Sequence, residues 1–222
     1  MMPDVIKPAA AVKSAAAVKL ADAVRAADVI RPEDIRPVKA GLREKYKILR
    51  RAMPRPEKER LDSVIAGRML SLWQYTRCKT LFTYCAAAIE VDTDSIILRA
   101  LADGKKVAVP RCVPGTREIE FYYIESLEEL SVGSFGIREP LPEPRRAVTN
   151  FRQGLCIVPA LCYDWHGYRL GYGKGYYDRF LSDFGGYTAG ICYHSCLVRR
   201  LPHGRYDRPV QLLVTEKIIK PI

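Results

Sequence analysis

The stretch that decides the fold consists of an apolar strand and a glycine-rich run that leads into a helix, Leu155-Cys-Ile-Val158 and Arg169-Leu-Gly-Tyr-Gly-Lys-Gly-Tyr-Tyr-Asp178. The four apolar residues predict a buried strand, which ends at Pro159. A helix is expected to start near Tyr176. Ligands of parallel α/β sheets bind beyond the carboxyl ends of the strands, and the glycine-rich run occupies that position. We therefore expect this run to bind a ligand.

The glycine-rich run has the composition of a phosphate-binding loop. Gly171, Gly173 and Gly175 alternate along it, and glycine accepts positive φ and lets an anion approach the backbone without meeting a Cβ. Successive main-chain N–H groups can then converge on one phosphate, together with the start of the helix. Arg169 and Lys174 add positive charge. These features predict a nucleoside triphosphate site.

Two common phosphate loops do not fit. A Walker A loop has Ser or Thr after Gly-Lys, whereas Gly175 follows Lys174, and the third glycine of the dinucleotide fingerprint is replaced by Tyr176. Asp178 could hold a divalent cation that also contacts the phosphates. The alternative is a flexible turn between a strand and a helix. The three tyrosines and the compact set of charges favour the phosphate site.

The rest of the chain alternates helices with strands. Helices are predicted at 39–53, 56–73 and about 92–102, and strands at 79–84, 106–110, 119–124, 155–158, 188–193 and 211–215. Residues 139–150 are rich in proline and are expected to form a loop, and Asp164 and Gly167 are expected to form a turn that presents Arg169. This alternation predicts an α/β fold, a single three-layer domain in which helices flank a largely parallel central sheet.

The first 38 residues differ from the remainder in composition. They consist mainly of Ala and Val, and because Ala has the highest helix propensity, residues 9–30 could form an alanine-rich helix. The proline-containing segment 30–37 is expected to be a linker. We therefore divide the chain into an N-terminal extension at 1–38, accessory to the fold or poorly ordered, and a folded domain at 39–222.

Charge and cysteine content restrict the class of protein. The net charge is +11, and since residues 1–38 hold six basic and five acidic side chains, the domain carries +10 (30 minus 20). Such a charge suits nucleic acid or small polyanions such as nucleotides and polycarboxylated metabolites. No run of about 18 apolar residues occurs, so no membrane span is expected. The seven cysteines form no CxxC pair. Several of them, such as Cys156 and Cys192, lie beside β-type residues and are expected to be buried thiols in a reducing cytoplasm.

Four segments carry more specific information. In chain order they are Lys39-Ala-Gly-Leu-Arg43, Tyr84-Cys-Ala-Ala-Ala-Ile-Glu-Val-Asp-Thr93, Phe135-Gly-Ile-Arg-Glu-Pro140 and Pro159-Ala-Leu-Cys-Tyr-Asp-Trp-His-Gly-Tyr-Arg-Leu-Gly-Tyr-Gly-Lys-Gly-Tyr-Tyr-Asp-Arg-Phe-Leu181. Together they resemble the motifs of the 5-formyltetrahydrofolate cyclo-ligases, also called methenyltetrahydrofolate synthetases. The resemblance covers residues 39 to roughly 216. The chain departs from the family pattern near its C-terminus, at Cys196, Gly204, Tyr206 and Gln211.

The resemblance implies an enzyme that uses ATP and Mg²⁺ to convert 5-formyltetrahydrofolate into 5,10-methenyltetrahydrofolate, ADP and phosphate. In that reaction the formyl oxygen is phosphorylated, N10 attacks the activated carbon, and phosphate leaves. Phosphoryl transfer requires cations, backbone donors and a metal more than a covalent nucleophile. The implied protein is a cytoplasmic monomer with a small-molecule substrate that can carry a polyglutamate tail, and it needs neither a membrane nor nucleic acid.

The resemblance also assigns the nucleotide and metal ligands. Arg169 and Lys174 are the implied catalytic residues. Lys39 and Arg43, which lie four residues apart and so share one face of a helix, contact ATP together with the loop residues Arg169, Leu170, Gly171, Tyr172, Gly173, Lys174, Gly175, Tyr176 and Tyr177. Asp178 and Asp207 are the implied metal ligands. A Lys–Arg pair on a helix is more often a solvated face, and an isolated Asp such as Asp207 is usually a turn former.

Glu90 and Cys85 are the implied substrate contacts. A fixed carboxylate suits a pterin because it can accept two N–H donors at once, whereas the small Cys85 belongs to the pocket wall. The alternatives are an acidic residue at a helix N-terminus for Glu90 and a buried core thiol for Cys85.

Two other functions stay open. One is a binding protein that keeps this fold without folate turnover and contacts RNA through its positively charged domain. The other is an ATP-using enzyme that acts on a different N-formyl substrate. The joint presence of Lys39, Arg43, Glu90 and Asp178 favours the cyclo-ligase, because a protein without that chemistry has little physical reason to keep all four.

Overall fold

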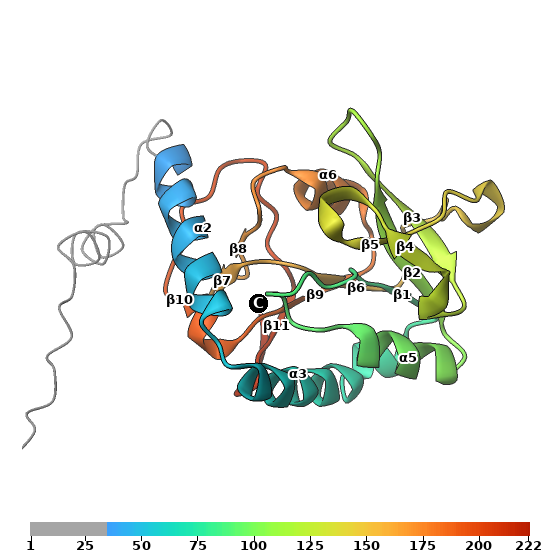
Figure 1. The fold of residues 1–222 in the computed structure, drawn as a ribbon, viewed down its shortest axis with the longest axis horizontal. Helices are drawn as coiled ribbons and strands as arrows, with labels where there is room; N and C mark the ends of the chain where they lie inside the picture. The colour runs from blue at the N-terminus through green and yellow to red at the C-terminus, as the bar shows by residue number, and fades with distance from the viewer. Residues whose placement is uncertain (1–34) are drawn as a thin grey trace, which may run out of the picture.

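A seven-stranded sheet lies at the centre of the computed structural model, which describes residues 35–222 (Figure 1). The strand order is β12-β11-β9-β6-β1-β2-β3. The five inner strands are parallel, namely β1 (Thr80–Phe82), β2 (Lys106–Cys112), β6 (Leu155–Val158), β9 (Tyr187–Ile191) and β11 (Leu212–Val214). The edge strands β3 (Ile119–Ile124) and β12 (Ile219–Pro221) are antiparallel to their neighbours. The largely parallel sheet predicted from the sequence is confirmed.

Helices cover the sheet from two sides. Helices α3 (Arg55–Leu70) and α5 (Asp94–Ala102) run along one side, and α6 (Tyr176–Asp183) lies on the opposite side, while α2 (Ile35–Arg51) stands across one end of the domain (Figure 1). A short helix, α4 (Trp73–Arg77), follows α3 after a turn at Ser71 and Leu72. The predicted helix at 56–73 was therefore too long, because Leu72 adopts an extended conformation (φ −67°, ψ 140°) that ends the helical path.

Two small sheets lie outside the central one and were not predicted. One contains β10 (Leu197–Val198), β7 (Cys162–Asp164) and β8 (Arg169–Leu170), and the other is the hairpin of β4 (Leu130–Val132) and β5 (Arg138–Pro140). Short 3-10 turns interrupt the connections at Leu127–Glu129, Ser134–Gly136, Pro144–Arg146 and His194–Cys196. Strand β6 is thus followed by the β7–β8 hairpin, whose second strand consists of the first two residues of the glycine-rich run. Strand β5 takes up the start of the predicted loop at 139–150.

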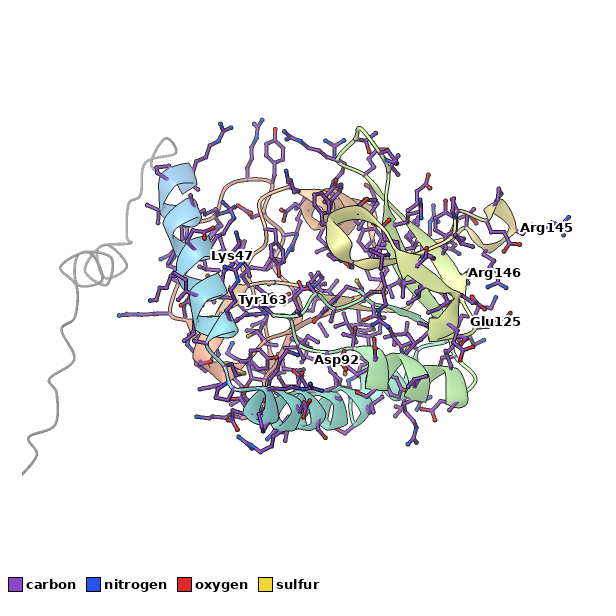
Figure 2. The ribbon with its side chains drawn as sticks, in the orientation of Figure 1. Lys47, Asp92, Glu125, Arg145, Arg146 and Tyr163 are labelled. Atoms are coloured by element: carbon purple, nitrogen blue, oxygen red, sulfur yellow. The ribbon has the colours of Figure 1, made fainter. Side chains whose placement is uncertain are left out.

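The core is formed by apolar side chains between the sheet and its helices. Strand β6 is buried along its whole length, as its four apolar residues predict. Aromatic side chains fill the remaining space: Phe82 packs edge-to-face against Phe121, with 5.4 Å between ring centroids. Tyr163 lies in the interior (Figure 2), where its hydroxyl donates to the carbonyl of Val158 over 2.8 Å. This contact holds β7 against the end of β6.

The N-terminal boundary differs from the prediction. Helix α2 begins at Ile35, so residues 35–37 of the predicted linker at 30–37 belong to a helix. Pro37 is compatible with this because a helix has no intrahelical partner for the N–H groups of its first turn. The predicted alanine-rich helix at 9–30 lies outside the described residues. Among residues 35–222, the structure contains no helix that is both long enough and apolar enough to cross a membrane.

Candidate active site

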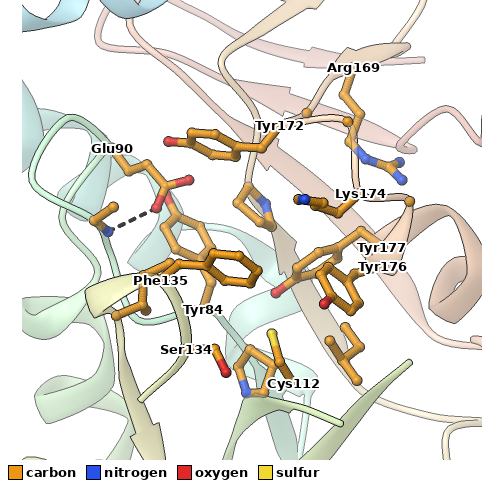
Figure 3. Close-up of a pocket in the computed structure, with 18 of the residues that line it drawn as sticks. Tyr84, Glu90, Cys112, Ser134, Phe135, Arg169, Tyr172, Lys174, Tyr176 and Tyr177 are labelled. Atoms are coloured by element: carbon orange, nitrogen blue, oxygen red, sulfur yellow. Dashed lines mark hydrogen bonds between the residues drawn. The ribbon is translucent and has the colours of Figure 1, made fainter. Parts of the chain in front are cut away.

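A cavity of about 440 Å³ opens between α2, the glycine-rich run and the segments that follow β1 and precede β5. Every residue that the sequence analysis proposed for the site lines this cavity. Glu90 lies on one side of it, and Arg169 and Lys174 lie on the other (Figure 3). We call the side with Lys39, Arg43, the run 169–177, Asp178 and Asp207 the cationic end, and the side with Glu90 the Glu90 end.

The glycine-rich run needs glycine at two of its three positions. Gly173 has φ +91° and Gly175 has φ +79°, which side-chain-bearing residues rarely adopt. A Cβ on Gly173 would also lie 3.0 Å from the Cζ atom of Arg43. Gly171 has no positive φ, but its carbonyl accepts a 2.9 Å bond from Nε of Arg43. Gly175 then leads directly into α6 at Tyr176, as predicted.

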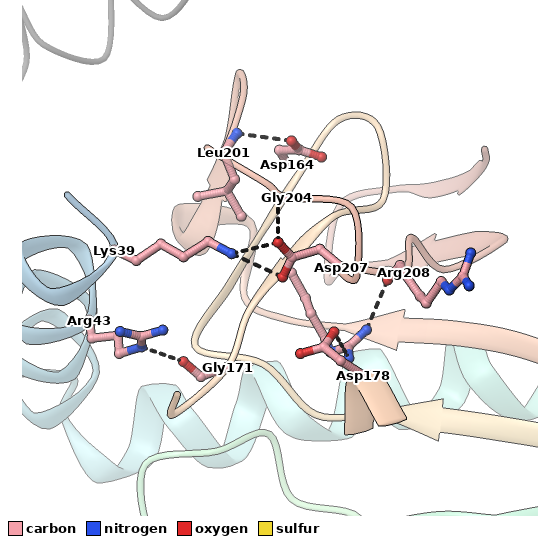
Figure 4. Close-up of polar contacts among 10 residues, drawn as sticks. Lys39, Arg43, Asp164, Gly171, Asp178, Leu201, Gly204, Asp207 and Arg208 are labelled. Atoms are coloured by element: carbon pink, nitrogen blue, oxygen red, sulfur yellow. Dashed lines mark hydrogen bonds and ion pairs between the residues drawn. The ribbon is translucent and has the colours of Figure 1, made fainter. Parts of the chain in front are cut away.

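Helix α2 supplies two cations to the cavity. Lys39 and Arg43 are half-buried and line the cavity rather than forming a solvated face. Nζ of Lys39 lies 2.9 and 2.8 Å from the two carboxylate oxygens of Asp207 (Figure 4). The spacing of four residues brings both side chains to one face of the helix, as the sequence predicts.

The two proposed metal ligands are both ion-paired. Asp178 forms an ion pair with Arg169, and Asp207 forms one with Lys39 (Figure 4). Burial raises the pKa of Asp178 above its usual range, and the negative charge of Asp207 acts in the same direction, against the opposing charge of Arg169. Two neighbouring carboxylates therefore compete for positive charge in this part of the cavity.

The donor set suits magnesium bound to phosphates. Within residues 35–222, no group of three or more His, Cys, Asp and Glu side chains is close enough together to enclose a metal ion. Magnesium usually takes one or two protein carboxylates, together with phosphate oxygens and water. Asp178 and Asp207 can provide that share, so the residues present fit such an ion when it is carried by a nucleotide.

A buried carboxylate holds the two loops of the cationic end together. Asp164 accepts hydrogen bonds from the backbone N–H groups of His166 (2.9 Å), Tyr168 (3.0 Å) and Leu201 (2.9 Å). Gly167, with φ +81°, donates to the carbonyl of Asp164 over 3.0 Å. The predicted turn is thus confirmed. It connects the hairpin that carries Arg169 to the segment that leads to Asp207.

Glu90 is buried at the end of a tight turn. Its exposed fraction is 4 %, and one carboxylate oxygen accepts from the backbone N–H of Ala87 over 2.9 Å. The other oxygen points toward the side of Tyr172 (Figure 3). Since α5 begins at Asp94, Glu90 is not part of the first turn of that helix, and the alternative interpretation is wrong. Burial raises the pKa of Glu90, opposed by the Ala87 N–H and by the charge of Arg50.

The walls near Glu90 are mostly apolar and aromatic. Cys85 is buried, and burial raises the pKa of its thiol to about 12, so the thiol stays protonated at neutral pH. Tyr84 and Tyr177 also line the cavity. The hydroxyl of Tyr177 is buried and has no hydrogen-bond partner among the described residues. A planar aromatic ligand would match such walls.

One wall of the cavity was not predicted from the sequence. It comes from β2, β3, the segment before β5 and β5 itself, and includes Cys112, Ile119, Ser134, Phe135, Arg138 and Glu139. Phe135 is 66 % exposed and has φ +59°, and its ring centroid lies 5.9 Å from Nζ of Lys174. The sequence signal for this wall is the Phe135–Pro140 motif, to which the family resemblance assigns no role.

Comparisons with known proteins identify the family. A model of the 5-formyltetrahydrofolate cyclo-ligase family matches residues 35–216. The chain belongs to this family. The cyclo-ligase of Escherichia coli (strain K12) is 29 % identical over 170 residues, which cover 75 % of this chain and 93 % of the relative. A Schizosaccharomyces pombe protein described as a probable cyclo-ligase is 32 % identical over 175 residues, covering 71 % and 85 %.

A solved structure is similar as well. The NMR structure of Aquifex aeolicus 5,10-methenyltetrahydrofolate synthetase has a TM-score of 0.73 and 34 % sequence identity to this cyclo-ligase family member. The match covers 83 % of this chain and 92 % of the Aquifex chain. The match thus extends beyond the local motifs to the domain as a whole.

Proposed function

We propose that this protein catalyses the ATP- and Mg²⁺-dependent cyclisation of 5-formyltetrahydrofolate to 5,10-methenyltetrahydrofolate, with release of ADP and phosphate. Family membership supports the cyclo-ligase activity. The observation that carries the finer assignment is the division of charge in the cavity. Cations and two carboxylates gather at one end, and a buried carboxylate stands at the other.

The reaction requires two steps. The γ-phosphoryl group of ATP is transferred to the formyl oxygen, and ADP departs. N10 of the folate then attacks the formyl carbon, loses its proton, and phosphate leaves with the former formyl oxygen. Lys174, Arg169, Lys39 and Arg43 would bind the phosphates and stabilise the charge that develops on them. The backbone N–H groups of the glycine-rich run would contribute further donors.

The carboxylates and cations of the cationic end would exchange partners when the nucleotide binds. Asp178 and Asp207 would hold the metal, which neutralises charge on the phosphate oxygens. The release of Lys39 from Asp207 and of Arg169 from Asp178 would free both cations for the phosphates. The present ion pairs keep these side chains positioned and neutralised until then.

Glu90 would bind the pterin through N–H donors of the ring, and the surrounding apolar surface, including Cys85, would enclose the ring. The buried position of Glu90 favours a strong hydrogen bond, since its carboxylate cannot be satisfied by bulk water.

The test is a direct assay. The protein is mixed with ATP, Mg²⁺ and 5-formyltetrahydrofolate, the ultraviolet absorbance of the methenyl product is followed, and ADP is measured in parallel. We expect one ADP for each methenyl product, and no product when ATP or Mg²⁺ is left out. Intact ATP binding without product would contradict the proposal and favour another N-formyl substrate. RNA binding that weakens steeply with salt, without turnover, would favour the binding-protein alternative.

A further inference from the structure

Arg50 lies on the same face of α2 as Lys39 and Arg43, but at the other end of the helix. Its exposed fraction is 3 %, although arginine is rarely buried to this extent without a charged partner. Nη1 donates to the carbonyl of Ile89 over 3.2 Å, and Nη2 donates to the carbonyl of Ala160 over 2.7 Å. Its Nε is buried and has no hydrogen-bond partner among the described residues.

Both of these carbonyls belong to residues next to the cavity lining. Ile89 precedes Glu90, and Ala160 follows Pro159, and both Glu90 and Pro159 line the cavity. Arg50 thus connects two cavity walls from behind. The ring of Tyr193 lies 5.4 Å from Cζ of Arg50, and the Tyr193 hydroxyl lies 3.4 Å from the carbonyl oxygen of Glu90. The Tyr193 hydroxyl donates its proton to Asp62 over 2.8 Å, so the turn that carries Glu90 is held mainly by the bond from Arg50 to the carbonyl of Ile89.

The burial of Arg50 has a substantial free-energy cost, because backbone carbonyls and an aromatic ring only partly replace water around a guanidinium group. Removing Arg50 alone would leave the carbonyls of Ile89 and Ala160 without this donor, and a buried polar group that loses its partner destabilises a protein. Besides these hydrogen bonds, a buried cation exerts an electrostatic field on neighbouring groups, because charges are screened less in the interior than in water. Glu90 follows Ile89 and lines the cavity, and the positive charge of Arg50 opposes the rise in the pKa of Glu90 that burial causes.

We propose that Arg50 is a positioning residue for substrate binding, which fixes the Ala87–Glu90 turn and keeps the Glu90 side chain in its carboxylate form. This inference rests on the proposed function, in which Glu90 receives the pterin. Arg50 itself would not touch the substrate. Other titratable or charged groups face Glu90 from the elements around it: Lys58 from α3, Tyr84 from the segment after β1, and Tyr172 and Tyr177 from the glycine-rich run and the start of α6.

Arg50→Met tests the charge. It removes the cation and keeps an unbranched apolar side chain. We expect the KM for 5-formyltetrahydrofolate to rise about tenfold at pH 7 and to recover as the pH increases, because Glu90 then ionises without assistance. The KM for ATP should change less than about twofold. Arg36→Met, an exposed position on the same helix, is the matched control.

A second pair of variants separates positioning from a general effect on folding. In a Glu90→Gln background, Arg50→Met should change the folate KM by less than about twofold at any pH, since no carboxylate remains to be influenced. Arg50→Lys keeps the charge but is too compact to bridge both carbonyls, so the pH profile should stay like that of the wild type while the KM rises by about threefold. The proposal would be overturned if Arg50→Met raised the folate KM equally in the wild-type and the Glu90→Gln backgrounds. A loss of kcat that does not depend on pH would overturn it as well.

One readout needs neither turnover nor folate. The side-chain carboxyl ¹³C signal of Glu90, followed by NMR in wild type and in Arg50→Met, should titrate at higher pH in the variant. An unchanged titration in a folded variant would overturn the role of Arg50. Absence of methenyl product from the wild-type protein would instead contradict the proposed function alone, so the two failures can be distinguished. If Arg50→Met does not fold, Arg50→Gln, which is neutral but keeps N–H donors for the carbonyls, takes its place: the Glu90 signal should again titrate at higher pH than in the wild type, and an unchanged titration would overturn the proposal.

Discussion

The two ends of the cavity hold their carboxylates in different ways. At the cationic end, Asp178 and Asp207 each have a cation in direct contact, and those cations belong to the proposed phosphate site. At the Glu90 end, the carboxylate is bound by a backbone N–H, and the buried cation Arg50 donates to carbonyl groups instead. Ion pairs of the first kind can exchange partners with an incoming ligand, whereas the second arrangement is fixed before the ligand arrives. This difference suits a polyanion bound with a metal at one end and a planar neutral ring at the other.

The largest effect should come from the exposed cation of the glycine-rich run. Lys174→Ala is expected to lower kcat by roughly 10²- to 10³-fold, because a donor to the transferred phosphoryl group is lost. Folding should be unaffected, since the side chain is exposed. Steady-state kinetics and circular dichroism would check this, with the exposed Lys79→Ala as control. A kcat within a factor of two of the wild type would remove Lys174 from the transition state.

The second-largest effect is expected from a substitution of Glu90, at the Glu90 end of the cavity. Glu90→Gln should raise the KM for 5-formyltetrahydrofolate by roughly 10- to 100-fold, because a charge-assisted hydrogen bond is replaced by a neutral one that also offers a donor in the wrong place. The KM for ATP should stay the same. Glu128→Gln, at an exposed position, is the control. Equal changes in both KM values would mean that the two ends are not independent.

Asp207→Asn tests whether the ion pairs of the cationic end exchange partners. The Mg²⁺ concentration needed for half-maximal rate is expected to rise about tenfold, because one of two carboxylate ligands is lost. Binding of ATP in the presence of a chelator should strengthen instead, since Lys39 no longer has an ion-pair partner. Calorimetric titration with ATP in the absence of metal would show whether the affinity increases, with the exposed Asp183→Asn as control. Weaker metal-free binding would contradict the exchange.

Glu90 should also reduce stability at high pH. Its pKa is raised in the folded state by burial, so the folded protein holds this proton more tightly than the unfolded chain does. The associated stability is present below the unfolded pKa and is lost as the pH rises through the folded one. Glu90→Gln should therefore raise the Tm at pH 8 by about 2–4 °C and change it little at pH 4. Thermal unfolding of the wild type and of Glu90→Gln at pH 4 and pH 8 would measure this difference in Tm. A lower Tm of Glu90→Gln at pH 8 would show that the hydrogen bond from the Ala87 N–H outweighs the cost of burying the charge.

The smallest effect is expected at Cys85. Its thiol is buried, and its pKa of about 12 leaves almost no thiolate at pH 8. Because the thiolate is the reactive form, iodoacetamide at pH 8 should leave the folate KM unchanged. Mass spectrometry of the peptide that contains Cys85, alongside the kinetics, would verify that it is unmodified. Rapid alkylation with a loss of folate binding would show that this wall opens.

Some of the elements that form the two ends of the cavity could be predicted from the sequence, and others could not. Strands 119–124 and 155–158 occur at the predicted positions, because uninterrupted apolar or β-branched runs identify buried strands. The glycine-rich run was identifiable because positive φ at Gly173 and Gly175 requires a specific residue type. The β7–β8 and β4–β5 hairpins were missed, since strands of two or three residues are too short to show an alternating pattern.

Arg50 was missed for a different reason. A cation on a charged helix normally faces water, and its burial depends on the carbonyls of Ile89 and Ala160, which lie 39 and 110 residues further along the chain. The available signal was its position, three turns after Lys39 on the same helix face. Long-range contacts of this kind cannot be derived from local residue types.

Helix α2 therefore determines the distance between the two ends of the cavity. Lys39 and Arg50 are eleven residues apart, so a rise of 1.5 Å per residue separates them by about 16 Å along one rigid axis. One residue inserted between Arg43 and Arg50 would rotate Arg50 by about 100° away from the Glu90 turn while leaving Lys39 and Arg43 in place. A deletion of one residue would rotate it equally far in the opposite sense. The helical phase of α2, rather than any single side chain, thus sets the register between the proposed phosphate and pterin sites.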